Sequence, residues 1–288
     1  MRRRWYVPYL YMGPAILLFG AFALYPLLRS AQFSLYEWDG LGPSTFVGFA
    51  NYADLIADPT LRAAFAHALV LIAFFALLPL AAGLTLAGIL VRGQARGLSV
   101  FRTVVFLPQV VAMVVVAVAW RHIYAPNGPL NTLLRAVGLG GWAKSWLGDY
   151  TWTLPAVGFV GTWVQLGLVT VLLMAGMSKI SPEIYQAARL DGAGPIREFF
   201  AITLPQVRGE IAVALTLTIV AALKTFDLVY VTTGGGPGTS TTVPAYEVYM
   251  RTFRQGAVGS GAAIAVTLAA IIFAINLVVN RVVDRRQR

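Results

Sequence analysis

The 288-residue sequence contains no cysteine and only two histidines, His67 and His122. The absence of cysteine excludes disulfide frameworks, Fe–S clusters, thiolate zinc sites and cysteine nucleophiles, and two histidines make a histidine metal cluster unexpected. Lysine occurs only at positions 144, 179 and 224 and never follows glycine, so the chain has no Walker A loop. We therefore expect no catalytic residues, no metal site and no cofactor bound by this chain itself.

Charged residues are also scarce: they make up 12% of the chain, whereas apolar residues make up 58%. Soluble domains carry about 25% charged and about 45–50% apolar residues. A helix that spans a membrane needs about 20 mainly apolar residues. Six segments are long enough: residues 11–34, 66–91, 103–124, 152–177, 208–231 and 260–282. The sequence predicts an all-α membrane protein of six transmembrane helices, with residues 1–288 forming a single transmembrane domain.

The basic residues indicate how the chain crosses the bilayer, because cytoplasmic loops collect Lys and Arg. If the N-terminus lies inside, the cytoplasmic side holds fourteen of the 22 basic residues: Arg2, Arg3, Arg4, Arg92, Arg96, Arg102, Lys179, Arg189, Arg197, Arg208, Arg281, Arg285, Arg286 and Arg288. Both termini are therefore predicted to be cytoplasmic, and the net charge of +10 is mostly an orientation signal. Since these residues form no single block, we expect no nucleic-acid partner.

The longest cytoplasmic connection, residues 181–207, contains its own helix signals. Ser181 is a candidate N-cap, Pro182 suits the first helical position, and Glu183 is favourable in the first turn. The segment 191–195, with its glycines and a proline, then predicts a turn. A second helix over 196–204 is predicted to end before Pro205 and to place Ile196, Phe199, Phe200 and Thr203 on one face. The result is a helix-turn-helix between spans four and five; an alternative is an elbow that merely covers the mouth of the bundle.

The same loop resembles a known family. Members share the pattern Glu-Ala-Ala, three residues, Gly, nine residues, Ile, one residue, Leu-Pro, and this chain has Gln186-Ala187-Ala188, Gly192, Ile202 and Leu204-Pro205 at every spacing. The pattern is typical of the integral membrane subunits of binding-protein-dependent ABC importers. The stretches FVGFANYADLIADP (46–59), FRTVVFLPQVVAMVVVAVAW (101–120) and KTFDLVYVTTGGGPGTST (224–241) resemble the sugar-type permeases, and the last of them resembles the first permease of the maltose, glycerol-3-phosphate and oligosaccharide importers.

This resemblance implies a function and a set of partners. It implies the translocation subunit of a carbohydrate importer in a bacterial or archaeal cell membrane, paired with a second, related permease. It further implies two cytoplasmic ATPase subunits that bind ATP and Mg²⁺, and an extracytoplasmic solute-binding protein. The loop would be a coupling helix that docks into the ATPase through Gln186, Ala187, Ala188, Asp191, Gly192 and Ala193. Because Gln186 replaces the family's Glu, a charged contact would become an amide hydrogen bond there.

A sugar pathway needs hydrogen-bonding and aromatic side chains on inward-facing surfaces, since polar groups that face lipid stay unsatisfied. The candidates, partly chosen by resemblance to the maltose-type site, are Gln109, Trp163, Gln165, Lys224, Thr225 and Asp227. Two alternatives remain open. Gln109 and Gln165 are equally well explained as interhelical hydrogen-bond partners, and Lys224 and Asp227, at i and i+3, are expected to pair with each other near the external interface.

Other functions are weighed against the carbohydrate importer. A glycerol-phosphate or polyol importer is the nearest alternative. A self-sufficient secondary transporter usually requires intramembrane carboxylates and inverted repeats, and here only Glu210 and Asp227 lie in or near a span and no repeat is evident. A membrane-bound enzyme would require a nucleophile with a base or a metal constellation, which the sequence lacks.

Overall fold

The computed structural model describes residues 7–92 and 97–284 and is predominantly helical. Its helices are α1 (Val7–Phe19), α2 (Tyr25–Phe33), α3 (Ala50–Ala57), α4 (Pro59–Ile72), α5 (Leu78–Arg92), α6 (Leu98–Val110), α7 (Met113–Ile123), α8 (Pro129–Ala136), α9 (Thr153–Met177), α10 (Pro182–Leu190), α11 (Pro195–Glu198), α12 (Leu204–Gln206), α13 (Arg208–Leu223), α14 (Asp227–Thr232), α15 (Pro244–Tyr249) and α16 (Val258–Asp284). Wider π-helical turns cover Gly20–Leu24, Ala73–Leu77, Phe199–Thr203 and Met250–Arg254, and a 3₁₀ turn covers Gly140–Trp142.

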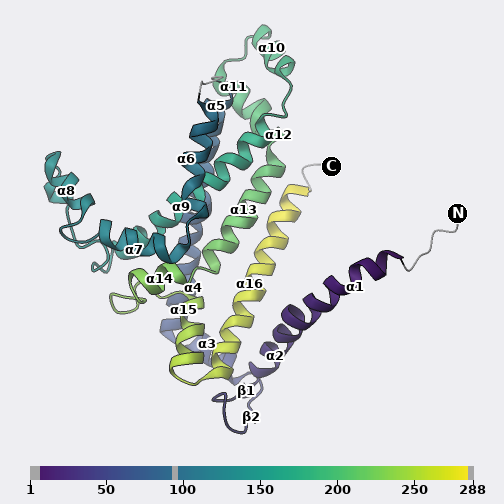
Figure 1. Ribbon diagram of the computed structural model, residues 1–288, viewed down its shortest axis with the longest axis vertical. Coiled ribbons are helices and arrows are strands. Elements are labelled where there is room, and N and C mark those ends of the chain that lie inside the picture. Colours follow the sequence, from purple (N-terminus) through teal and green to yellow (C-terminus); the bar gives the residue numbers. More distant parts are fainter. Residues whose placement is uncertain (1–6, 93–96, 285–288) are drawn as a thin grey trace. The chain divides into compact units, whose positions relative to one another are not determined.

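The described residues form two compact units, whose elements are labelled in Figure 1. The first joins the residues up to Pro59 with Glu247–Ala269, and the second comprises Thr60–Tyr246 and the residues from Ala270 onward. The first unit contains a departure from the all-α prediction, a short antiparallel hairpin of β1 (Tyr36–Glu37) and β2 (Thr45–Phe46).

Four helices are long and apolar enough to cross a membrane: Tyr11–Phe33, Pro59–Leu90, Thr153–Met177 and Val258–Val279. Two further spans arise if each of two bent helix pairs counts as one, Leu98–Val110 with Met113–Ile123 and Pro195–Gln206 with Arg208–Leu223. The predominantly helical membrane fold is therefore confirmed, with four to six candidate spans. The count of six and the orientation stay predictions.

Two of the predicted spans are not continuous helices. The third bends by 97° at Val111 and Ala112, where the backbone is not helical. Pro108, three residues before the bend, is buried and has no backbone N–H to donate to the helix. The fifth, predicted over 208–231, ends at Leu223, and a new helix begins at Asp227, whose carboxylate is favourable in a first helical turn. Apolar run length predicted both segments but not their interruptions.

Helix α9 lies at the centre of the second unit, against α5, α6, α13 and the π-helical turn Ala73–Leu77 (Figure 1). Glycines allow these close contacts: a Cβ atom at Gly161 would lie 1.9 Å from the Phe75 ring, and one at Gly167 would lie 2.2 Å from the Val105 carbonyl oxygen. Buried Val157, Val160 and other apolar side chains of α9 fill the space around them. Such contacts through small residues supply the packing that the hydrophobic effect does not supply inside a bilayer.

The first unit is held together by hydrogen bonds that its hairpin makes to other segments. The carbonyl oxygen of Trp38 accepts the N–H of Val258 at 2.9 Å, at the start of α16. The side-chain amide of Asn51, on α3, donates to the carbonyl oxygens of Ser34 at 2.9 Å and Tyr36 at 3.0 Å. Segments far apart in sequence are thereby fixed at one end of α16.

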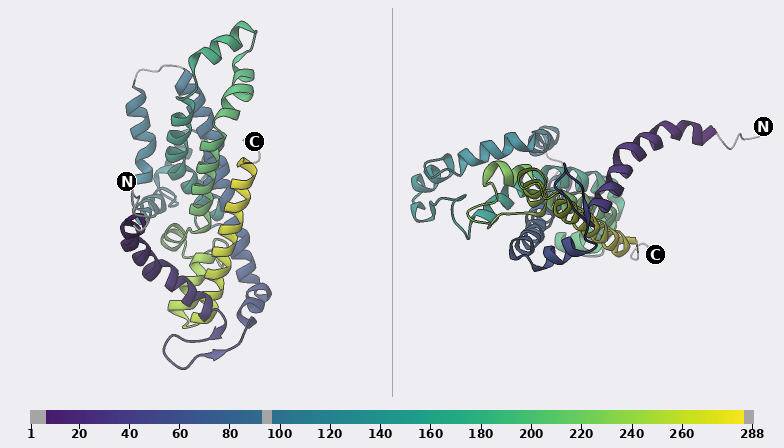
Figure 2. Two further views of the ribbon diagram at one scale, coloured as in Figure 1. Left: turned by 90° about the vertical axis from the view of Figure 1, so that its right-hand side faces the viewer. Right: turned by 90° about the horizontal axis from the view of Figure 1, so that it is seen from below.

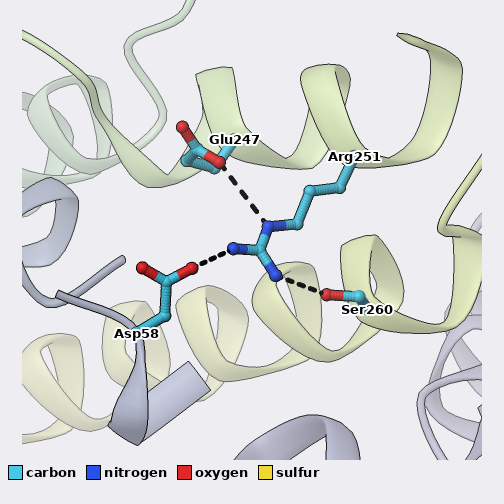
Figure 3. Close-up of polar contacts among 4 residues, drawn as sticks. All are labelled: Asp58, Glu247, Arg251 and Ser260. Atoms are coloured by element: carbon cyan, nitrogen blue, oxygen red, sulfur yellow. Dashed lines mark hydrogen bonds and ion pairs between the residues drawn. The ribbon is translucent and has the colours of Figure 1, made fainter. Parts of the chain in front are cut away.

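Arg251 makes the densest polar cluster of this unit (Figure 3). Its guanidinium donates to Asp58 and to Ser260 Oγ, the latter at 2.9 Å, and lies 3.6 Å from Glu247 Oε2. Only 18% of the Arg251 side chain is exposed. Burial raises the pKa of Glu247, the charge of Asp58 raises it further, and Arg251 counteracts both effects. The guanidinium therefore lies between two neighbouring carboxyl groups and opposes the effect of burial on Glu247.

Replacing Arg251 tests this cluster. We expect Arg251→Met to lower the free energy of unfolding by about 1–3 kcal/mol, because hydrogen bonds to charged groups are lost. The defect should shrink as the pH falls, since a carboxyl group with a raised pKa takes up a proton and the repulsion between Asp58 and Glu247 is relieved. The measurement is the thermal unfolding of the purified protein in detergent at several pH values. Arg254→Met, an exposed arginine of the same π-helical turn, is the control; equal losses in both variants would contradict the assignment.

Candidate functional site

The loop between α9 and α13 forms a two-armed elbow, residues 178–207. In Figures 1 and 2 its first arm, α10, lies beyond the ends of α9 and α13. The predicted start and end of α10 are confirmed: Pro182 occupies the first turn with Glu183, and the helix ends at Leu190 before Gly192, which has a φ of +81°. Ser181 stands at the N-cap position, but its side chain makes no capping hydrogen bond, so that part of the prediction was wrong.

The second arm of the elbow differs from the prediction. It is helical over Pro195–Gln206 and continues one residue past Pro205, which directly follows the π-helical turn Phe199–Thr203 and Leu204. The four residues predicted to share a face do not share one. Thr203 is buried and Phe199 is half-buried, whereas Ile196 and Phe200 are 77% and 62% exposed. The π-helical turn Phe199–Thr203 changes the angular step between residues, and a period of 3.6 no longer describes which side chains face inward.

The residues predicted to couple to an ATPase lie on the tip and the first arm of the elbow. Gln186, Ala187, Asp191 and Gly192 are exposed, and Ala188 and Ala193 are half-buried. The structure thus brings all six together in one continuous stretch that is accessible to a partner. At the base of the elbow, Lys179 Nζ donates to Glu210 Oε1 at 3.1 Å, which gives Glu210 a structural contact.

The two glutamines of the predicted pathway lie on two helices that pack against each other, Gln109 on α6 and Gln165 on α9. The backbone of α6 lies close to α9 at Gly167, opposite Val105. Gln165 precedes Gly167 by two residues on α9, and Gln109 follows Val105 by about one turn on α6. The Oε1 atoms of Gln109 and Gln165 are both buried and have no hydrogen-bond partner among the described residues. These oxygens therefore do not act as interhelical hydrogen-bond acceptors in this structure. Two buried acceptors that remain unsatisfied are costly, at about 1–3 kcal/mol each.

Trp163 belongs to an aromatic cluster next to this region. It is 40% exposed, and its ring centroid lies 5.6 Å from that of Trp120 on α7 in an edge-on arrangement. Trp120 also contacts Tyr124 and Phe159, and these rings line an apolar cavity of about 560 Å³. Neither Gln109 nor Gln165 lines this cavity. The cavity is nearly free of polar groups, and so the amides rather than the cavity offer hydrogen bonds to a hydroxyl-rich molecule.

The polar residues after α13 occupy the break between two helices. Thr225 is buried, whereas Lys224 and Asp227 are both exposed. Among the residues that the structure describes, no ion pair joins Lys224 to Asp227, and the predicted pairing was wrong. The spacing i, i+3 places two side chains on one face only within a continuous helix, and here the helix stops at Leu223 and starts again at Asp227.

Sequence reasoning missed four residues of the elbow that contact one another. Tyr185 and Arg189 on α10 face Thr203 and Glu198 on the second arm, respectively, in two side-chain hydrogen bonds. No motif marks these positions, and their pairing depends on how the second arm winds. The described residues also contain no group of three His, Asp or Glu side chains that could hold a metal ion.

Comparison with known proteins places the chain among transport proteins. Residues 79–288 match the family described as "Binding-protein-dependent transport system inner membrane component". The chain is 37% identical to the probable ABC transporter permease protein YurN of Bacillus subtilis, with 94% of each chain covered. It is 34% identical to the diacetylchitobiose uptake system permease protein NgcF of Streptomyces coelicolor, over 94% of this chain and 81% of the relative.

A more distant relative and a solved structure extend this picture. The sn-glycerol-3-phosphate transport system permease protein UgpA of Yersinia pestis is 29% identical, over 98% of this chain and 96% of the relative. A chain from a bacterial ABC transporter involved in the import of the acidic polysaccharide alginate matches with a TM-score of 0.82 at 22% identity, covering 98% of this chain and 96% of that one. The latter match shows that the fold is shared.

Separating α6 from α9 tests the packing between the two helices that carry Gln109 and Gln165. We expect Gly167→Val to lower the free energy of unfolding by about 1–3 kcal/mol, because the added side chain collides with the α6 backbone. The measurement is thermal unfolding in detergent. Gly209→Val on α13 is the matched control, since no atom lies within 4 Å of a Cβ at that glycine, and its effect should stay within about 0.5 kcal/mol. A tolerated Gly167→Val would refute the close approach.

Proposed function

Because the chain belongs to the binding-protein-dependent transport system inner membrane component family, we propose that it is the translocation subunit of an ATP-driven carbohydrate importer. Relatives named for diacetylchitobiose, lactose and glycerol-3-phosphate transport support this substrate class. Such a subunit is not an enzyme; it supplies the path through the membrane. The observation that carries the proposal is that an elbow with the family's spacing is exposed at one end of the helices, while buried polar groups lie between them.

In this proposal the bent pair Leu98–Val110 and Met113–Ile123 forms one span and residues 208–231 form another, while the second arm of the elbow stays outside the bilayer. Together with the four continuous candidates this gives six spans with both termini in the cytoplasm. The excess of Lys and Arg in the loops assigned to the inside supports this orientation. The chain would then be a multi-pass protein of a bacterial or archaeal cell membrane. A single transmembrane permease domain over 1–288 accommodates the two compact units, since both contribute to spans.

The elbow is the proposed contact with the cytoplasmic ATPase. The small side chains of Ala187 and Ala188 allow another surface to approach closely, and Gln186 offers an amide for hydrogen bonding. Asp191, Gly192 and Ala193 at the tip complete the contact. ATP and Mg²⁺ belong to the two ATPase subunits, and their movement would reach the spans through this elbow.

The pathway for substrate is proposed to pass Gln109, Trp163, Gln165, Lys224, Thr225 and Asp227. Sugar hydroxyls are hydrogen-bond donors and would satisfy the two buried amide oxygens, which have no protein partner among the described residues. The aromatic face of Trp163 suits the apolar face of a sugar ring. An external solute-binding protein would deliver the sugar. A solved structure of the same fold, a bacterial alginate ABC transporter in complex with an alginate pentasaccharide-bound periplasmic protein, supports such a partner.

A second, related permease is proposed to cover surfaces that this chain leaves exposed. None of the residues in the apolar window of the span Tyr11–Phe33 is buried within the chain. Lys224 and Asp227 are exposed next to a span, and exposed charges are unfavourable against lipid. A partner that lines the other half of the pathway would shield both charges.

A phosphorylated polyol is the second candidate substrate. Lys224 is exposed and has no carboxylate partner in the described part of the chain, so its ammonium group is available to an anionic substrate. The relative named for sn-glycerol-3-phosphate transport agrees with this alternative. Uptake of diacetylchitobiose, lactose and glycerol-3-phosphate as three labelled probes would separate the two substrate classes.

A bulky side chain at Ala187 tests the docking role of the elbow. We expect Ala187→Trp to abolish co-purification of the ATPase and binding-protein-stimulated ATP hydrolysis, because an indole prevents close approach to the first arm. Ala53→Trp, the same change at an exposed position of α3, should leave both unchanged. Retention of the ATPase by Ala187→Trp would refute the docking assignment.

The pathway role of Gln165 is tested by removing its amide. We expect Gln165→Leu to leave the stability unchanged or higher by up to about 1 kcal/mol, since it removes an unsatisfied buried group. Uptake should nevertheless fall by about 2- to 10-fold, the value of one lost hydrogen bond to substrate.

The control for Gln165→Leu is Thr170→Val on the same helix. The Thr170 hydroxyl already donates to its own helix at Leu166 O, 2.7 Å away, so uptake should not change. If Gln165→Leu lowers stability and uptake together, the glutamine is a structural residue and the pathway assignment fails.

A further inference from the structure

The inner side of the elbow carries two hydrogen bonds that no docking role requires. Arg189 Nε donates to Glu198 Oε1 at 2.9 Å, and the hydroxyls of Tyr185 and Thr203 are 2.9 Å apart. Both bonds join α10 to the second arm of the elbow. Tyr185 and Arg189 stand at i and i+4 on α10, so their side chains share one helical face. That face is distinct from the exposed positions Gln186 and Ala187.

The partners on the second arm are five residues apart, a spacing that an α-helix does not place on one face. At 3.6 residues per turn, five residues advance about 500°, which leaves them about 140° apart. The π-helical turn Phe199–Thr203, in which the N–H of Leu204 bonds to the carbonyl of Phe199, spreads one turn over more residues. Residue i+5 thereby returns close to the direction of residue i. The π-helical turn is what allows Glu198 and Thr203 to face α10 together.

Burial and charge make the first of these bonds a strong one. Glu198 is 2% exposed, and its bond to Arg189 is charge-assisted on both sides. Arg189 itself is 61% exposed, so it reaches in from the surface of α10 to a carboxylate buried beside the second arm. The second arm leads through Val207, which is fully buried, directly into α13.

We propose that Arg189–Glu198 and Tyr185–Thr203 form a double brace that makes α10, the second arm and α13 move as one rigid piece. In this proposal the four act as positioning residues, through their contacts with one another. Without the brace, a displacement of α10 by the ATPase would be absorbed in the turn around Gly192 instead of reaching the span. The inference deepens the proposed function and rests on its assignment of α10 as the docking helix.

The geometric part of the proposal is tested without transport. Because the chain contains no cysteine, a pair of spin labels can be placed at Glu183→Cys on α10 and Val213→Cys on α13, both exposed positions. The distance between the labels is measured by pulsed electron paramagnetic resonance on the purified chain. We expect one narrow distance distribution in the braced chain, a broadened one in Arg189→Met and Tyr185→Phe, and the broadest in the double variant.

Two controls distinguish bracing from a general loss of structure. Arg197→Met removes another exposed arginine of the same elbow, which makes no side-chain hydrogen bond in the described structure, and should leave the distribution narrow. Arg189→Lys keeps the charge and should restore part of the narrow distribution. Tyr185→Phe removes only one hydroxyl and should preserve the fold. It therefore keeps the proposal testable even if Arg189→Met fails to fold. An unchanged distribution in the double variant would overturn the proposal.

The functional part is tested on the assembled importer in liposomes. We expect Arg189→Met and Tyr185→Phe to retain the ATPase and to hydrolyse ATP, while the number of sugar molecules imported per ATP falls relative to wild type and Arg197→Met. An unchanged ratio alongside a broadened distribution would overturn the functional half of the proposal. Loss of ATPase binding only in Ala187→Trp supports docking by α10. If the ATPase binds normally to Ala187→Trp, the proposed docking role of α10 is wrong. The distances between the spin labels then still test whether the two hydrogen bonds hold α10 and α13 rigidly together.

Discussion

The close packing of neighbouring segments against the glycines of α9 is the constraint on which the second unit depends. Inside a bilayer, apolar side chains gain little by leaving lipid for protein, so helices associate mainly through contact area and hydrogen bonds. Gly158, Gly161 and Gly167 leave no room for a side chain against Phe74, Phe75 and the α6 backbone, respectively. A residue larger than glycine would force the Phe74 or Phe75 ring aside at the first two positions and the α6 backbone away from α9 at the third.

The second constraint is the interruption of helices inside apolar segments. Irregular backbone is tolerated at membrane depth only where protein or a cavity satisfies its polar groups. Here the breaks occur at Val111–Ala112, two residues after Gln109, and at Lys224–Phe226, which includes Thr225. Both breaks therefore coincide with residues assigned to the pathway. Broken helices also form the binding sites of secondary transporters. The likeness is physical and implies no common ancestry with this chain.

The sequence allowed the helical membrane fold, the α10 helix and its exposed residues to be predicted, since these depend on apolar run length, proline placement and local spacing. The break after Leu223 was missed although Lys224, Thr225 and Asp227 interrupt the apolar run there, because apolar residues resume at Leu228, Val229 and Val231 and the whole segment is long enough for one span. The face of the second arm was predicted wrongly because the π-helical turn Phe199–Thr203 replaces the period of 3.6. The partners Arg189 and Glu198 could not be found for the same reason, as their contact depends on that turn.

The polar side chains within the apolar segments differ in how their hydrogen bonds are met. Thr170, Thr218 and Thr232 donate to carbonyl oxygens four residues earlier in their own helices, at 2.7, 2.8 and 2.6 Å. A hydroxyl satisfied in this way tolerates lipid or protein on any side and carries no information about a ligand. A glutamine amide has two donors and an acceptor oxygen with two lone pairs, more than its own helix can meet. The unpartnered oxygens of Gln109 and Gln165 are therefore a better guide to a polar pathway than the more numerous threonines.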